Sequence, residues 1–170
     1  MKNYFACFCA VATGLTGCTA TPSPSAQKEM KMTVESKQTD LKAILEAALD
    51  DERKAESFYA AVLKKHGDIR PFINIIEAER RHAEAVIGLM ERRGWDVPEN
   101  PYNGTEMVPA TLAEACRMAI TAEEENIALY DRLLPTVTED DVKFVLTNLQ
   151  RASRENHLPA FTRCLARQGG

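Results

Sequence analysis

Three glutamates and two histidines stand where the spacing of apolar residues predicts the buried side of a helix. They are Glu52, Glu79, His82, Glu123 and His157. Burying an isolated carboxylate is costly, so such a group normally takes up a proton or finds a partner. Because a divalent cation offsets carboxylate charge and also binds imidazole, this set of side chains predicts a metal site.

Four helices must position these side chains, because apolar residues recur with a helical period from position 39 onward. We expect helices over about 40–65, 70–93 and 111–134, and a fourth that starts near Thr138. Gly67 and Gly94 are suitable C-terminal caps for the first two, and Thr111 with Glu114 is a capping box for the third. The inward positions of the fourth helix are Val142, Leu146, Leu149, Ser153, His157, Phe161 and Cys164.

The second half of the chain repeats the first. Residues 41–63 align without a gap on residues 112–134, so that Glu52 matches Glu123 and Tyr59 matches Tyr130. In the other pair of helices His82 matches His157. We therefore predict an all-α four-helix bundle of two pseudo-symmetric helical hairpins. The long loop 94–110, with three prolines, is the crossover that carries the chain back along the bundle.

One glutamate from each of two helices, and Glu-x-x-His from each of the other two, is the pattern of ferritin-like carboxylate bundles. The segments "RPFINIIEAERRHAEAV", "EEENIALY" and "ENHLPAF" resemble one branch of that superfamily, the bacterial and archaeal domain of unknown function 2202. The resemblance covers about residues 40–168. It implies a ferritin-like fold and gives Tyr59 and Tyr130 the place of tyrosines that support the ligands.

The donor set suits one or two Fe or Mn ions, and Zn is also compatible, because mixed oxygen and imidazole ligands discriminate poorly. On this interpretation Glu79 and Glu123 bridge or chelate, Glu52 is a terminal ligand, and His82 and His157 each complete one metal position. The resemblance is to a family without a settled activity. It permits metal oxidation, peroxide handling or metal buffering without choosing among them.

One position departs from the pattern. Arg154 stands three residues before His157, where Glu-x-x-His requires a glutamate, and Glu155 projects to another side of the helix. We expect Arg154 beside the site. Three alternatives stay open: a metal site with altered ligands, a metal-free core held by salt bridges, and an unrelated bundle whose glutamates and histidines are exposed.

In the metal-free alternative the bundle is an interaction module for another envelope protein. The loop residues Trp95, Pro98, Pro101 and Tyr102 would then form the contact surface. The competing interpretation is that Trp95 and Tyr102 pack the crossover loop onto the helices.

The N-terminus predicts export and a lipid anchor. Residues 1–17 read as a secretory signal peptide, with one lysine and a short apolar stretch. The segment "LTGC" resembles a bacterial lipobox, which implies cleavage before Cys18 and lipid on its sulfur. Residues 18–38 are rich in Ser, Thr, Pro, Lys and Gln, so we expect a flexible tether between a membrane and a bundle over 39–170. The expected location is the bacterial cell envelope, periplasmic or extracytoplasmic.

Charge and cysteine content bear on partners and redox state. The formal net charge is −4 without any basic block, which argues against nucleic acid as a partner. Cys116 lies seven residues before Glu123, and Cys164 lies seven after His157. In antiparallel helices the two thiols would lie at similar height, so an oxidising compartment allows a disulfide between them. The alternative is two buried free thiols.

Overall fold

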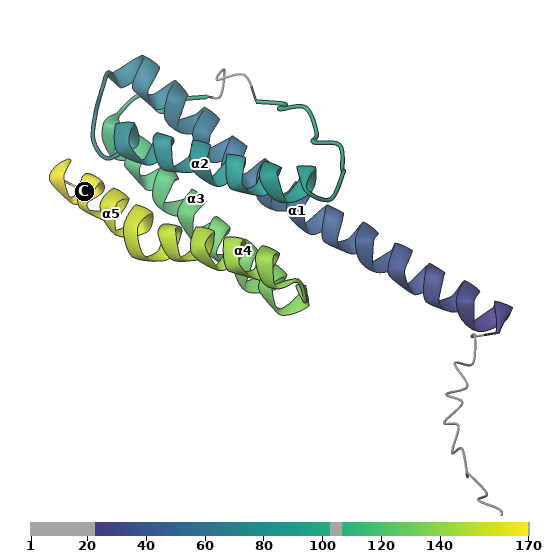
Figure 1. Cartoon of the computed structure of the whole chain (residues 1–170). Coiled ribbons are helices and arrows are strands. Elements are labelled where there is room, and N and C mark those ends of the chain that lie inside the picture. Colours follow the sequence, from purple (N-terminus) through teal and green to yellow (C-terminus); the bar gives the residue numbers. More distant parts are fainter. Residues whose placement is uncertain (1–22, 103–106, 170) are drawn as a thin grey trace, which may run out of the picture. The chain divides into compact units, whose positions relative to one another are not determined.

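The computed structural model describes residues 23–102 and 107–169, and all regular elements within these ranges are helical. The helices are α1 (Pro24–His66), α2 (Phe72–Glu91), α3 (Leu112–Leu133), α4 (Asp140–Ala152) and α5 (Leu158–Arg167). A 3₁₀ turn (Leu134–Thr136) follows α3, and a π-helical turn (Ser153–His157) joins α4 to α5. Because α4, the π-helical turn and α5 form one continuous column (Figure 1), the predicted all-α four-helix bundle is confirmed.

The helices end at the residues that the sequence marks as stops. Gly67 follows α1 with φ of 83°, and Gly94 follows α2 with φ of 66°. Glycine reaches this left-handed region without the steric cost that a Cβ imposes. At the start of α3 the Thr111 side chain accepts a 3.2 Å hydrogen bond from the Glu114 backbone amide, and the Glu114 carboxylate accepts one from the Thr111 amide. The predicted capping box is therefore present.

The buried side chains form two apolar clusters with a polar layer between them. One cluster includes Leu45, Leu49, Val86, Leu89, Leu146 and Leu149. The other includes Tyr59, Phe72, Ile76, Ala119, Phe161 and Cys164. Along α1, for example, Leu49 belongs to the first cluster and Phe58 to the second, and the buried Glu52 lies between them. The apolar clusters on both sides hold the helices together and keep the polar layer away from bulk water.

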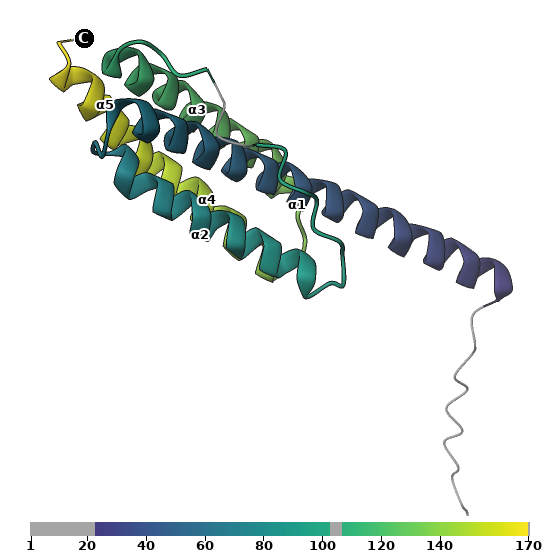
Figure 2. The ribbon, with the colours of Figure 1, turned by 90° about the horizontal axis from the view of Figure 1, so that it is seen from above.

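The crossover loop between α2 and α3 follows α1 (Figure 2). Arg53 donates a 2.8 Å hydrogen bond to the carbonyl of Pro98, and the Tyr102 hydroxyl donates to the carboxylate of Asp50. Further along α1, Lys65 donates to the carbonyl of Val108. Trp95 packs against the first apolar cluster. These contacts favour the packing interpretation of Trp95 and Tyr102 over an exposed contact surface.

The expectation of a flexible tether over 18–38 is wrong for its described part, because residues 24–38 are the beginning of α1. Glu, Lys, Met, Gln and Ala in this stretch are strong helix formers, and Pro24 suits the first turn. Extending an existing helix is also much easier than nucleating one. Among the described residues, 23–35 belong to one compact unit and 36–169 to another.

The expected signal peptide over 1–17 and the lipidation residue Cys18 lie outside the described residues. Within the described ranges, none of the helices combines the length and the apolar character that crossing a membrane requires.

Candidate metal centre

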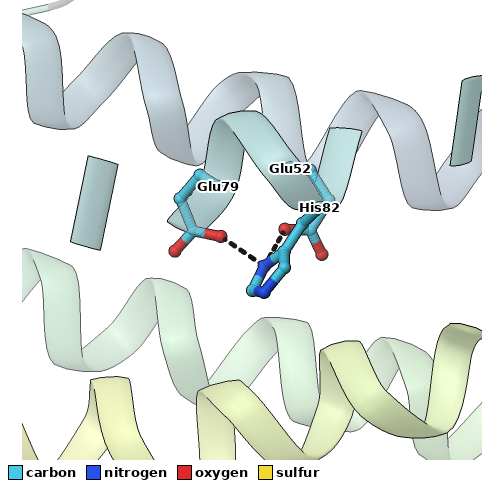
Figure 3. Close-up of side chains that lie close together, drawn as sticks. All are labelled: Glu52, Glu79 and His82. Atoms are coloured by element: carbon cyan, nitrogen blue, oxygen red, sulfur yellow. Dashed lines mark hydrogen bonds and ion pairs between the residues drawn. The ribbon is translucent and has the colours of Figure 1, made fainter. Parts of the chain in front are cut away.

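His82 on α2 lies between two buried carboxylates. Its Nδ1 is 3.1 Å from Oε2 of Glu52 on α1 and 3.0 Å from Oε2 of Glu79, one turn earlier on α2 (Figure 3). Glu52 and Glu79 are 1% and 2% exposed, so both carboxylates are withdrawn from water. The three side chains thus converge on one point between α1 and α2.

His157 in the π-helical turn occupies the equivalent place in the other half of the bundle. Its Nδ1 lies 3.1 Å from Oε1 of Glu79 and 3.5 Å from Oε2 of Glu123 on α3. The rings of His82 and His157 stack with centroids 5.6 Å apart. Glu79 therefore faces one imidazole with each of its two oxygens, and it is the side chain that the two halves share.

The Nδ1 atom of His157 is buried yet lacks a hydrogen-bond partner with acceptable geometry, the one such side-chain nitrogen or oxygen among the described residues. The Glu79 and Glu123 oxygens are close to it but off the line of its N–H. A buried polar atom without a partner is costly. An ion between the nitrogen and the two carboxylates would satisfy all three groups, so this atom fits a metal ligand.

Two tyrosine hydroxyls hold the carboxylates of Glu123 and Glu52 in place through hydrogen bonds. Tyr59 on α1 donates a 2.7 Å hydrogen bond to Oε1 of Glu123, and Tyr130 on α3 donates a 2.6 Å hydrogen bond to Oε1 of Glu52. Both tyrosines are fully buried. Each hydrogen bond occupies one carboxylate oxygen and leaves Oε2 directed at the neighbouring imidazole. Burial and the adjacent carboxylates hold the pKa of both phenols well above their usual value.

The ionisable groups of the layer shift one another's pKa. Burial raises the pKa of Glu52 to about 7. Burial also opposes ionisation of Glu79, but the adjacent imidazoles of His157 and His82 outweigh that effect and lower its pKa. Burial disfavours the charged imidazoles as well, and the paired carboxylates overcome it, raising the pKa of His82 to about 9 and of His157 to about 10. Without a metal, imidazolium protons would therefore balance the carboxylate charge.

The geometry defines two candidate metal positions with a common ligand. Glu52, Glu79 and His82 offer ligand atoms within 4.8 Å of one another, and so do Glu79, Glu123 and His157. Carboxylate and imidazole donors suit Fe, Mn and Zn. These buried groups can hold a metal ion, and the shared Glu79 is placed to touch both positions. The structure thus brings together all five residues that the sequence proposed as ligands.

Arg154 is not beside the site, and that expectation is wrong. Its side chain is half exposed and pairs with Asp131 at 3.2 Å. The cause is the π-helical turn, whose i→i+5 hydrogen bonding widens the helix so that residues four apart, rather than three, share a side. Ser153, four before His157, is therefore the buried residue, and Arg154 turns outward. No guanidinium replaces a metal at this site.

Asn126 and Asp51 adjoin the site, and the sequence analysis missed them. Asn126 is buried; its amide group donates to Asp51 at 2.6 Å and to Glu52 at 3.3 Å, and its oxygen accepts from Ser153 at 2.7 Å. Burial raises the pKa of Asp51 to about 6. A usable signal was the spacing, because Asn126 follows Glu123 by three residues and so shares its side of α3.

Cys116 on α3 and Cys164 on α5 form a disulfide, with Cα atoms 5.9 Å apart. Both cysteines are buried in the second apolar cluster, next to the polar layer but not within it. The bond joins the helix that carries Glu123 to the helical column that carries His157. It therefore ties together two of the elements that position the candidate ligands.

The family model of an uncharacterized protein domain, DUF2202, matches residues 42–170. The uncharacterized protein MJ0754 of Methanocaldococcus jannaschii is 27% identical over 137 residues, which are 71% of this chain and 72% of that protein. The crystal structure of this hypothetical protein superposes with a TM-score of 0.66 at 26% identity, covering 76% of this chain and 81% of the other. The predicted family is confirmed, whereas the ferritin-like link and the lipoprotein signal stay predictions.

Proposed function

We propose that this chain, which belongs to the DUF2202 family of uncharacterized protein domains, binds a pair of Fe or Mn ions in its core and uses them in redox chemistry. One observation carries the proposal. Glu79 faces Nδ1 of both His82 and His157, and each imidazole faces one further carboxylate. This arrangement offers two adjacent positions that share a carboxylate, as in dinuclear carboxylate bundles.

Each residue has a definite part in this proposal. Glu52 and His82 would hold one ion, Glu123 and His157 would hold the other, and Glu79 could contact both. Tyr59 and Tyr130 fix the carboxylates of Glu123 and Glu52 through their hydrogen bonds. Supporting hydrogen bonds of this kind orient ligands and tune a metal site. The apolar clusters on either side limit the contact of the carboxylates with bulk water.

The two adjacent metal positions and the cavity that reaches them support a redox role over simple storage. A pair of Fe(II) ions held there would supply two electrons, which together with two protons from water reduce one hydrogen peroxide to two waters. A cavity reaches Glu79 and Glu123 and gives a small oxidant room to approach them. The substrate class that we propose is therefore a small oxygen species, dioxygen or hydrogen peroxide, with Fe(II) as the reductant. Zn would fit the same donors but would leave the site without redox activity.

The proposal includes an envelope location. The "LTGC" segment supports lipid attachment at Cys18, which would anchor the chain to a membrane. The disulfide between Cys116 and Cys164 supports an oxidising compartment, where such bonds persist.

A second candidate is a metal-free bundle that acts as an interaction module in the envelope. The raised pKa values of His82 and His157 favour it, because imidazolium ions can neutralise the buried carboxylates without a metal. The unpartnered Nδ1 of His157 argues against it, since a core evolved around ion pairs should satisfy that atom.

Anaerobic loading with Fe(II) followed by rapid mixing with hydrogen peroxide or dioxygen tests the redox proposal. We expect the near-ultraviolet absorbance of Fe(III) to rise faster with the native chain than with free Fe(II). The Glu79→Gln variant should abolish that difference, and Glu91→Gln, at an exposed position on α2, is the matched control. A native chain that retains Fe(II) but reacts no faster than free Fe(II) would contradict the redox role and leave metal buffering.

A further inference from the structure

A cavity of about 70 Å³ lies between α1 and α3 and extends from the surface to the candidate metal centre. At its outer side are the exposed Lys54 and Glu125, and at its inner side are the buried Glu79 and Glu123. Asp51 is partly buried, so its exposure is intermediate between that of the outer and the inner residues. The volume is sufficient for water molecules.

Small side chains leave this cavity open. Ala55 on α1 and Ala122 on α3 are part of its wall, together with the aromatic rings of Phe58 and Tyr59. Larger residues at the two alanine positions would fill the space. This opening leads from the surface directly to Glu79 and Glu123.

The residues that line the cavity carry an excess of negative charge, which favours the entry of cations. Four carboxylates line the cavity, Asp51, Glu79, Glu123 and Glu125, against the single ammonium of Lys54, a formal excess of 4 − 1 = 3 negative charges. A cleft lined by one sign of charge, with low-dielectric walls, focuses its field and raises the local concentration of the opposite ion. The unpartnered Nδ1 of His157 faces Glu79 and Glu123 at the inner end.

We infer that this cavity is the path by which divalent transition-metal ions reach the core, with Glu125 and Asp51 as successive carboxylates that replace water on the entering ion. The inference rests on the proposed metal function and deepens it by assigning the route. The orientation of Asp51 fits this role, because Asn126 holds it at 2.6 Å beside the buried carboxylates. Asp51 is therefore a positioning residue for the incoming ion, whereas the five core residues are the ligands.

The rate of Co(II) loading tests the route, because Co(II) needs no oxidant and its visible absorption changes when it leaves water for protein ligands. Stopped-flow mixing of the metal-free chain with Co(II) gives that rate. We expect Glu125→Lys to slow loading and Lys54→Glu to speed it, each by about three- to tenfold at low salt, with smaller effects at high salt. The Co(II) held at saturation should match that of the native chain.

Matched controls separate the local field from net charge. Glu91→Lys and Lys143→Glu make the same charge changes at exposed positions outside the cavity and should leave the loading rate within about twofold of the native value. Ala122→Phe fills the cavity and should slow loading further, with circular dichroism and thermal melting showing whether the fold is retained. Ala122→Leu is the milder substitution if the phenylalanine variant fails to fold.

The outcomes distinguish the route from the site. Slower loading with Glu125→Lys, faster loading with Lys54→Glu and unchanged controls would support the inference. If the two cavity variants and the two control variants all load Co(II) at the native rate and still bind it at saturation, the route is overturned, but the metal site is not. A native chain that retains no Co(II) at all would overturn both.

Discussion

The hydroxyl of Tyr59 on α1 donates a 2.7 Å hydrogen bond to the carboxylate of Glu123 on α3. The same relationship recurs with the halves exchanged, since Tyr130 on α3 donates to Glu52 on α1. Each tyrosine therefore fixes a candidate ligand that belongs to the other hairpin. The pseudo-twofold symmetry of the chain is thereby built into the site, and neither half can position its carboxylate alone.

Replacing either tyrosine should loosen the carboxylate that it holds. For Tyr59→Phe and Tyr130→Phe we expect metal affinity to fall by roughly 10- to 100-fold, as is typical when a hydrogen bond to a ligand is removed. Loss of the hydroxyl should also lower the free energy of unfolding of the metal-free chain by about 1 kcal/mol. Competition with a chelator of known affinity, followed by metal analysis, measures the first effect.

The control for the tyrosine variants is Tyr102→Phe, which removes a hydroxyl hydrogen bond to Asp50 at the crossover loop. It should leave metal affinity unchanged. Equal affinities in all three variants and the native chain would show that the tyrosines do not orient ligands.

The sequence predicted the fold and the five inward polar residues because both depend on helical period, which is local. Glu52 and Glu123 were recognisable from their place between apolar residues and from the repeat. The π-helical turn was not recognised from Ser153–His157 themselves, although Pro159 just after them is a signal, because proline cannot donate the backbone hydrogen bond of a regular α-helix. That turn places Arg154 at the surface, whereas Ser153 is buried as its inward position predicted. The helix over 24–38 was missed because its residues favour a helix individually while lacking an apolar side.

Removal of Arg154 should not affect the site. Arg154→Ala breaks an exposed ion pair with Asp131, which contributes less than about 1 kcal/mol to stability. We expect its metal content to equal that of the native chain. Ser153→Ala is the informative comparison, because it removes a buried hydrogen bond to Asn126 and should weaken binding. Loss of metal in Arg154→Ala but not in Ser153→Ala would show that the π-helical turn is absent in solution.

The metal-free chain should lose stability as the pH rises from neutral to alkaline. The pKa values of His82 and His157 in the folded state, about 9 and about 10, lie above the ordinary value of 6.5. A histidine whose pKa is raised in the folded state stabilises the fold fully when the pH is below its unfolded-state pKa. This stabilisation is lost as the pH rises through its folded-state pKa. The pKa of Glu52 is also raised, to about 7, so its ionisation likewise lowers stability as the pH rises, but at lower pH.

Urea denaturation of chelator-treated protein at several pH values measures this dependence. We expect the free energy of unfolding to decrease by on the order of 1–3 kcal/mol between pH 7 and 10. The variant His157→Gln should show a smaller decrease. An unfolding free energy that increases over this pH range would contradict the ion pairs of the polar layer.

The disulfide should stabilise the fold without contributing to metal binding. It closes a loop between residues 48 apart in the sequence, for which chain entropy gives about 4 kcal/mol as an upper figure. Replacing both Cys116 and Cys164 by serine should lower the free energy of unfolding by roughly 2–4 kcal/mol. Metal content should be unchanged, because the cysteines lie in the second apolar cluster. Free thiols located at Cys116 and Cys164 by alkylation and peptide mapping of denatured, unreduced protein would contradict the bond.

The number of metal ions that each chain retains shows whether the core holds a dinuclear centre. Native protein, Glu52→Gln and Glu79→Gln would be loaded anaerobically with Fe(II) or Mn(II), desalted and analysed by plasma mass spectrometry. Because Glu79 is shared, the dinuclear account predicts about two ions in the native chain, about one in Glu52→Gln and close to none in Glu79→Gln. A native chain that retains no metal would contradict the account and leave a core of protonated histidines paired with glutamates.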